Sequence, residues 1–201
     1  DRLLSRGLGD VYKRQDRPVT VKCRIGIDDM DPQTGLDRFV DAVADAGAQV
    51  IYLHARKAWL NGFSPKENRE IPPLDYGRAE RLARRRPDLD IILNGGLTDR
   101  DMTSAMLQPV GQIFAGVMLG RAAYKTPYQL GLFHQILHNK TAPIDLEDIA
   151  LKMTDYAEQQ IKTGVPLQAI TRHMLGLCAG LKGARAFRLE LGEQARMPGT
   201  D

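Results

Sequence analysis

Polar and charged side chains follow four short apolar segments of the chain, and their types fit recognition of a phosphorylated ligand. The four clusters are Lys22 with Arg24, His54 with Arg56, Asn94-Gly95-Gly96, and Gly120-Arg121. Glycines let backbone N–H groups approach phosphate oxygens, and an arginine can bind such oxygens bidentately. Together, the four clusters indicate a site for a phosphorylated cofactor.

A long polar loop follows the second apolar segment. We expect a strand over residues 50–53 that breaks at His54, followed by HARKAWLNGFSPKENREIPPLDY with the cations Arg56, Lys57, Lys66 and Arg69. A loop of this length inside a compact domain is usually functional or disordered. Two interpretations stay open: a site for something anionic and planar, or a solvated loop in which His54 is a cap.

Alternating strands and helices position these clusters. Strands are predicted over residues 18–25, 49–53, 91–93 and 112–119, and helices over residues 36–46, over 75–86 with Asp75 as cap, and after Thr98. The spacing of the strand ends is close to one βαβ unit of about 30 residues. Short apolar strands of this kind are typical of a parallel sheet, whose carboxyl-terminal edge carries the chemistry.

The pattern becomes helical after Pro127, over residues 128–138, 146–162 and 166–177. We therefore predict an α/β domain at residues 17–126 and a helical domain at residues 127–201. Four βαβ units cannot close an eight-stranded barrel, so half of such a barrel is expected. Residues 1–16 contain a DVYKRQ stretch (residues 10–15) typical of sequencing artefacts, and we expect a non-native leader there; a natural basic tail is the alternative.

Composition sets few limits on function. The chain is 43% hydrophobic and 26% charged with a net charge of +3, which permits a nucleic-acid partner without requiring one. Cys23 and Cys178 lie far apart without metal-ligand spacing, so no metal site is expected. The absence of a long apolar run or a secretory signal predicts a reduced, cytoplasmic protein.

Lys22 lies in an otherwise apolar strand, where burying its charge is costly without a partner. A flavin fits, because a cation near N1 and O2 of its ring stabilises the anionic reduced form. His54 can donate to the same ring, and Arg24 shares a strand face with Lys22, so it can orient a uracil-like carbonyl. The alternative is a strand end directed to the surface.

Five motifs resemble the tRNA-dihydrouridine synthases, and more narrowly their DusA subgroup: VKCRIGIDD, HARKAWLNGFSPKENREIPPLDY, NGG, GVMLGRAAY and MLGLCAGLKGARAFRLEL. The resemblance covers residues 18–193. It implies an FMN-bearing (β/α)8 TIM barrel, of which the four strands are strands five to eight, and a small all-α tRNA-binding domain. It also implies reduction of uridine to 5,6-dihydrouridine in the D-loop of tRNA, with NADPH as reductant.

The resemblance also assigns roles to individual residues. The FMN contacts would be Lys22, His54, Asn94, Gly95, Gly96, Gly120 and Arg121. The contacts with uridine and tRNA would be Arg24, Arg56, Lys66, Arg69, Arg185 and Arg188. The family usually has Trp and a second Arg where this chain has Phe187 and Leu189, which weakens the expected RNA contact there.

No catalytic residue is assigned within this chain. The family uses a cysteine to protonate uridine, and neither Cys23 nor Cys178 matches its motif. We expect that cysteine to precede residue 1, the chain alone to be inactive, and the full-length protein to be monomeric. Two alternatives stay open: another FMN barrel, of the dihydroorotate or dihydropyrimidine dehydrogenase type, and a non-catalytic RNA- or phosphate-binding fragment.

Overall fold

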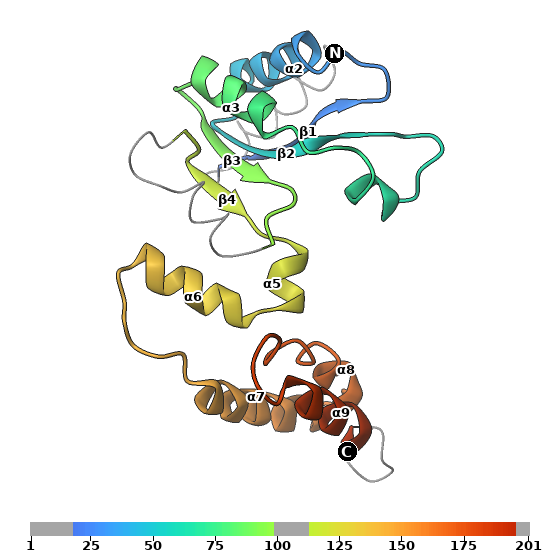
Figure 1. Ribbon diagram of the computed structural model, residues 1–201, viewed down its shortest axis with the longest axis vertical. Coiled ribbons are helices and arrows are strands. Elements are labelled where there is room, and N and C mark those ends of the chain that lie inside the picture. The colour runs from blue at the N-terminus through green and yellow to red at the C-terminus, as the bar shows by residue number, and fades with distance from the viewer. Residues whose placement is uncertain (1–17, 99–112, 196–201) are drawn as a thin grey trace. The chain divides into compact units, whose positions relative to one another are not determined.

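The computed structural model describes residues 18–98 and 113–195 (Figure 1). The predicted leader, the helix predicted after Thr98 and the start of the predicted fourth strand at Gln112 lie outside these residues. The chain divides into two units, Asp1–Leu119 and Gly120–Asp201. The predicted boundary after residue 126 falls inside the second unit.

The first unit is an α/β unit built on a parallel sheet. Its described elements are β1 (Val21–Ile27), α2 (Thr34–Asp45), β2 (Val50–Ala58), the 3-10 turn η1 (Glu67–Arg69), α3 (Tyr76–Arg85), β3 (Asp90–Asn94) and β4 (Gly116–Met118). The four strands pair in parallel in the order β1-β2-β3-β4. The predicted α/β class and parallel four-stranded sheet are therefore confirmed, whereas their identity as barrel strands five to eight stays a prediction.

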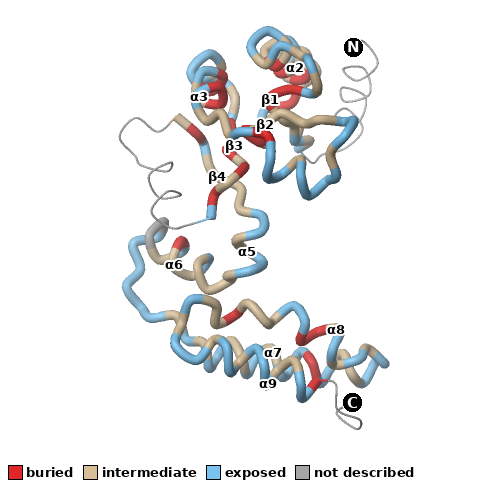
Figure 2. Tube along the Cα trace, turned by 45° about the vertical axis from the view of Figure 1, so that its right-hand side comes forward, coloured by how far each residue is buried: buried red, intermediate tan, exposed pale blue. Residues whose placement is uncertain are grey.

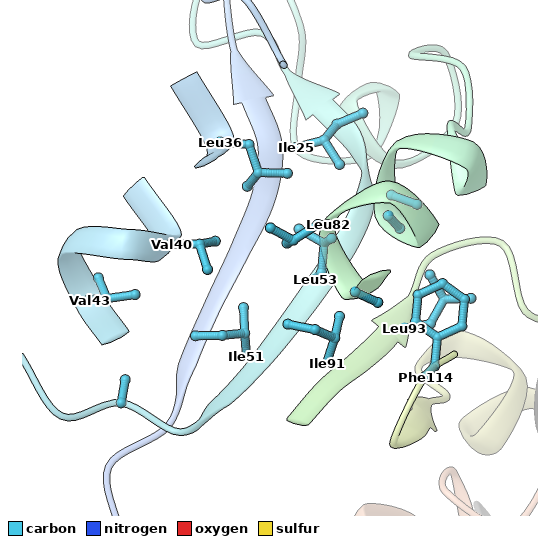
Figure 3. Packing of buried hydrophobic residues seen from close by; sticks show 14 residues of the cluster. Ile25, Leu36, Val40, Val43, Ile51, Leu53, Leu82, Ile91, Leu93 and Phe114 are labelled. Carbon is cyan, nitrogen blue, oxygen red and sulfur yellow. The ribbon is translucent and has the colours of Figure 1, made fainter. Parts of the chain in front are cut away.

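The hydrophobic core lies between one face of the sheet and the helices α2 and α3 (Figure 3). Alternate strand residues supply it, including Ile51 and Leu53 of β2 and their register partners Ile91 and Leu93 of β3. The core side chains of α2 and α3 recur at helical spacing: Leu36, Val40, Val43, Ala79 and Leu82. Each leucine, isoleucine or valine side chain among them, when fully buried, contributes about 1.5–3 kcal/mol.

Side-chain hydrogen bonds fix where α2 and α3 begin. The Asp31 carboxylate accepts from the backbone N–H groups of Thr34 and Gln33, and these bonds, led by that from Thr34, lower its pKa to about 2. The predicted cap Asp75 accepts from the N–H of Arg78 at 2.8 Å. The Arg78 side chain is buried and donates to the Pro32 carbonyl, so α3 is tied to the entrance of α2.

The strand β2 does not break at His54, as the sequence predicted, but continues to Ala58. A register shift between Arg24 and Gly26 of β1 lets Gly26 pair with Lys57 and Ile27 with Ala58. Such a bulge keeps the strands paired beyond the irregularity, so the backbone groups that follow His54 find partners. The described part of the fourth strand is shorter than predicted and begins only at Gly116.

The described elements of the second unit are helices: α5 (Arg121–Lys125), α6 (Tyr128–Leu137), α7 (Leu146–Ile161), α8 (Leu167–Thr171) and α9 (Ala184–Gln194). The helix predicted over residues 166–177 ends at Thr171, and turns follow it. Buried apolar residues of this unit include Phe133, Ala157, Ile170 and Leu177 (Figure 2). Among the described residues, no helix has the length and apolar character needed to span a membrane.

Candidate functional site

A row of four residues crosses the sheet on the face opposite the core. Arg24, His54, Asn94 and Met118 are register partners on β1, β2, β3 and β4. Lys22 lies two residues before Arg24 and therefore points to the same face, because side chains alternate along a strand. The sheet thus brings together four of the predicted site residues from three separate stretches of sequence.

A hydrogen bond joins Lys22, which lies beside the row, to Asn94 within it. The Lys22 ammonium donates to Asn94 Oδ1 at 3.2 Å, and Asn94 Nδ2 donates to the Met118 carbonyl at 2.8 Å. These two bonds fix the orientation of the amide. Burial lowers the pKa of Lys22, and the nearby Arg24 lowers it further. No carboxylate of residues 18–98 and 113–195 forms an ion pair with Lys22.

The glycine pair after Asn94 is shaped by close contact with His54. Gly95 and Gly96 have φ values of +109° and +68°, a region that glycine adopts without steric cost. A Cβ on Gly95 would lie 2.4 Å from His54 Cδ2, so only glycine lets the imidazole approach this closely. The Tyr76 hydroxyl donates to the Gly95 carbonyl at 2.7 Å and supports the turn from the other side.

Arg24 and Arg56 hold the long loop in place. Arg24 Nη1 donates to the carbonyls of Lys57 at 2.8 Å and Asn68 at 2.9 Å, and Arg56 Nη1 donates to the carbonyls of Glu70 and Pro72. Burial lowers the pKa of Arg24, followed by the charges of Arg56 and Arg69. The Nε atom of Arg56 is buried without a hydrogen-bond partner in the described structure. Two residues predicted to contact substrate therefore also shape the loop.

Asn68 is a structural residue of the loop that the sequence analysis missed. Its side-chain amide accepts from the Trp59 N–H and donates to the Trp59 carbonyl, both at 2.7 Å. Its own carbonyl receives the bond from Arg24. Asparagine is common in turns because its amide replaces backbone partners, but that preference alone does not reveal a partner nine residues away.

The outer part of the loop presents cations and aromatic rings. Lys66 and Arg69 are exposed at the two ends of η1. The Lys57 ammonium lies 5.5 Å from the Trp59 ring centroid, and Phe63 packs edge-on against Trp59 with centroids 6.5 Å apart. Cations interleaved with aromatic rings suit a partner with phosphates and flat bases.

A sequence model of the dihydrouridine synthase (Dus) family matches residues 1–200. The chain belongs to the dihydrouridine synthase family. It is 48% identical over 186 residues to a protein of Shewanella oneidensis, with 92% of this chain and 54% of that protein covered. It is 49% identical over 184 residues to one of Pasteurella multocida, with 91% of this chain and 55% of that protein covered.

Both relatives are named tRNA-dihydrouridine(20/20a) synthase. A protein of Xanthomonas axonopodis pv. citri has the same name; it is 47% identical over 183 residues, which cover 91% of this chain and 53% of that protein. The resemblance to this family and to its DusA subgroup is thereby confirmed. The chain spans about half the length of the curated relatives it matches.

The remaining candidates of this Dus-family chain lie in the second unit. Gly120 precedes α5, and Arg121 is its exposed first residue. Arg185 and Arg188 are exposed on α9. The grouping of Gly120 and Arg121 with Lys22 stays a prediction.

The two cysteines of the Dus-family chain lie outside the polar row. Cys23 is the register partner of Leu53 and packs against the core, and burial raises the pKa of its thiol to about 11. Cys178 is partly buried in the second unit. Within residues 18–98 and 113–195, no group of three or more His, Cys, Asp or Glu side chains is arranged to hold a metal ion.

Proposed function

We propose that the protein reduces uridines in the D-loop of tRNA to 5,6-dihydrouridine, with FMN as cofactor and NADPH as reductant. The observation that carries the proposal is the Lys22 ammonium. It lies on the same face of the sheet as His54 and Asn94, and it donates to the neutral Asn94 amide at 3.2 Å rather than to a carboxylate. A cation so held keeps its charge for an anionic ligand.

The residues of the row fit a flavin. FMN, when bound, supplies a hydride to the uracil ring. Lys22 would hold the N1 and O2 side of the ring, His54 would donate to the same ring system, and the fixed Asn94 amide would present both a donor and an acceptor. Gly95 and Gly96, with Gly120 and Arg121, would bind the phosphate through backbone N–H groups and a guanidinium.

Arg24 and the cations of the loop would bind the substrate. Arg24 uses Nη1 for the carbonyls of Lys57 and Asn68, so its Nε–H and Nη2 groups are left to orient a uracil carbonyl. Arg56, Lys66 and Arg69 would attract the tRNA backbone near that uridine. Arg185 and Arg188 would do the same from the second unit. The name of the relatives, which refers to tRNA positions 20 and 20a, supports this assignment.

Neither cysteine of the chain is given the proton-donating role. Cys23 lies on the core side of β1, away from the row. Its pKa, raised to about 11, keeps the thiol protonated. Uridine reduction is therefore proposed for the complete gene product, and we expect the 201-residue chain alone to turn over no substrate. An NADPH-oxidation assay with tRNA on both proteins tests this expectation.

The flavin proposal is tested by purifying the complete gene product and measuring its visible flavin absorbance. The wild-type protein is expected to be yellow and the Lys22→Ala variant to lose most of its flavin. Arg84→Ala is the matched control, because Arg84 is an exposed cation of α3 paired with Glu80. A colourless wild-type protein to which added FMN does not bind would contradict the proposal.

The tRNA proposal is tested with the double variant Lys66→Ala/Arg69→Ala. It should weaken tRNA binding and reduce the dependence of log Kd on log salt by about 1 for each lost phosphate contact, without loss of flavin. The control Arg84→Ala/Lys152→Ala removes the same charge from two helix cations that are already paired. Equal tRNA affinity in the two double variants would refute the role of the loop.

A further inference from the structure

Three side chains of the second unit form a hydrogen-bonded chain. The Tyr124 hydroxyl lies 2.8 Å from His173 Nδ1, and Arg172 Nε donates to His173 Nε2 at 3.0 Å. Tyr124 belongs to α5, whereas Arg172 and His173 follow α8. The backbones also meet closely, because a Cβ on Gly176 would lie 2.4 Å from the Lys125 carbonyl oxygen. The cluster is therefore built on two segments held tightly together.

The hydrogen bonds determine the protonation of His173. The Nε–H of arginine can only donate, so Nε2 of His173 must accept. A neutral imidazole that accepts at Nε2 carries its proton at Nδ1 and donates it to the Tyr124 oxygen. The hydroxyl proton of Tyr124 is then left to donate elsewhere. His173 thus orients an arginine without offering it a carboxylate.

This arrangement differs from that of the arginines around α3. Arg78 pairs with Asp37, Arg84 with Glu80, and Arg86 with Asp41 and Asp88. A carboxylate holds a guanidinium in place but also compensates its charge. Arg172 is exposed and, within the described residues, has no carboxylate partner, and its Nη1 and Nη2 groups donate to none of them. Its charge and its two terminal amino groups remain available to a ligand.

We propose that His173 is a positioning residue for an RNA contact, in which it orients the Arg172 guanidinium toward a phosphate without neutralising it. The inference rests on the proposed tRNA substrate and deepens it. A guanidinium fixed before binding loses less side-chain entropy and matches phosphate oxygens bidentately. The Tyr124 hydroxyl, whose residue is 58% exposed, donates to the same RNA backbone. The exposed cations Lys182, Arg185 and Arg188 extend the positive charge of this unit.

The test measures tRNA affinity of the complete gene product by fluorescence anisotropy at several salt concentrations. Arg172→Ala is expected to weaken binding about tenfold and to reduce the salt slope by about 1. His173→Gln keeps an acceptor near the Nε2 position and should bind within about twofold of wild type. His173→Asn reaches only the Nδ1 position, so it keeps the Tyr124 contact, releases Arg172, and should bind as weakly as Arg172→Ala. Arg84→Ala is the charge-matched control.

The outcomes separate the two proposals. Wild-type protein without tRNA affinity overturns both this inference and the tRNA substrate. Wild-type affinity that survives Arg172→Ala, or equal affinities of the Gln and Asn variants at residue 173, overturns the inference alone. Circular dichroism spectra and melting temperatures that match wild type in every variant ensure that a lost contact, rather than a lost fold, is measured.

Discussion

The two faces of the parallel sheet are made from the same strands and hold opposite kinds of side chain. Toward α2 and α3 the strands present Leu53 and Leu93, and on the other face their sequence neighbours His54 and Asn94 form the polar row. Adjacent residues therefore belong to the hydrophobic core on one face and to the proposed ligand site on the other. The difference teaches that substitutions one residue apart should affect different measurements, and the four predictions below test this from the largest effect on free energy to the smallest.

Leu53→Ala should have the largest effect on stability. Leu53 is fully buried between the sheet and its helices, so its truncation leaves a cavity that costs about 2–5 kcal/mol of unfolding free energy. Urea denaturation followed by circular dichroism measures this loss. Ile27→Ala on β1, where the side chain is 47% exposed, is the control and should stay within about 0.5 kcal/mol of wild type. Similar losses in both variants would remove the distinction between buried and exposed strand residues.

Cys23 should be protected from alkylation by the fold. Burial raises the pKa of its thiol from 9.0 to about 11, so at pH 8 its thiolate fraction is about a hundredfold lower, equivalent to about 2.7 kcal/mol. In a Cys178→Ser background, iodoacetamide should therefore react about a hundredfold more slowly with native than with urea-unfolded protein.

The sign of the pH dependence follows from the same shift. The unfolded thiol loses its proton first, so the stabilisation from Cys23 is complete below pH 9 and is lost as the pH rises toward 11. Fast alkylation of the native protein at pH 8 would mean that Cys23 faces the polar row or solvent rather than the core.

Gly95→Ala should lower both stability and flavin binding, because the added methyl group displaces a residue of the row. Gly95 has a φ of +109°, so alanine should lower the unfolding free energy by about 1–3 kcal/mol. Its Cβ would lie 2.4 Å from His54 Cδ2 and would push the imidazole aside. Flavin content should fall together with the melting temperature. Gly62→Ala shares a positive φ, +87°, but meets nothing within 4 Å, so it should lower stability while leaving flavin content intact.

Lys22→Met should have the smallest effect on stability and a large effect on flavin. Lys22 is exposed, so its replacement should change the unfolding free energy by no more than about 0.5 kcal/mol. Partial desolvation of its ammonium on the sheet lowers its pKa, and the charge of Arg24 lowers it further, so flavin affinity in the wild type should decline with rising pH below the usual range of lysine. An equilibrium dialysis titration between pH 7 and 10 measures this affinity. If Lys22→Met bound flavin as tightly as wild type, Lys22 would not be a flavin contact.

The sequence predicted the strands, helices and polar row because these depend on local patterns. Apolar runs separated by βαβ spacing located β1, β2 and β3, and the preference of Asp75 for a helix start located α3. Alternation along the strand predicted that Lys22 and Arg24 share a face, and Cys23 between them packs against the core. The polar residues of the row, Arg24, His54 and Asn94, could be named because polar side chains at the ends of apolar strands are easily recognised, whereas Met118 could not.

The paths of β2 and of the long loop could not be predicted, because they depend on contacts between distant residues. The bulge after Arg24 extends β2 past His54, and no pattern within residues 54–58 signals it. The loop depends on bonds such as that from Arg24 to the Asn68 carbonyl, which joins residues 44 positions apart. The sequence revealed the charge of Arg24 but not its partners.

The two hydrogen bonds between the Trp59 backbone and the Asn68 amide close the tip of the loop. The eight residues 60–67 lie between these two residues, and Arg24 donates to the Lys57 and Asn68 carbonyls at the base of the loop. Selection can then alter the length and sequence of this stretch without disturbing the strands beneath it. A change in this stretch would then alter the surface offered to a partner and leave the polar row of the sheet as it is.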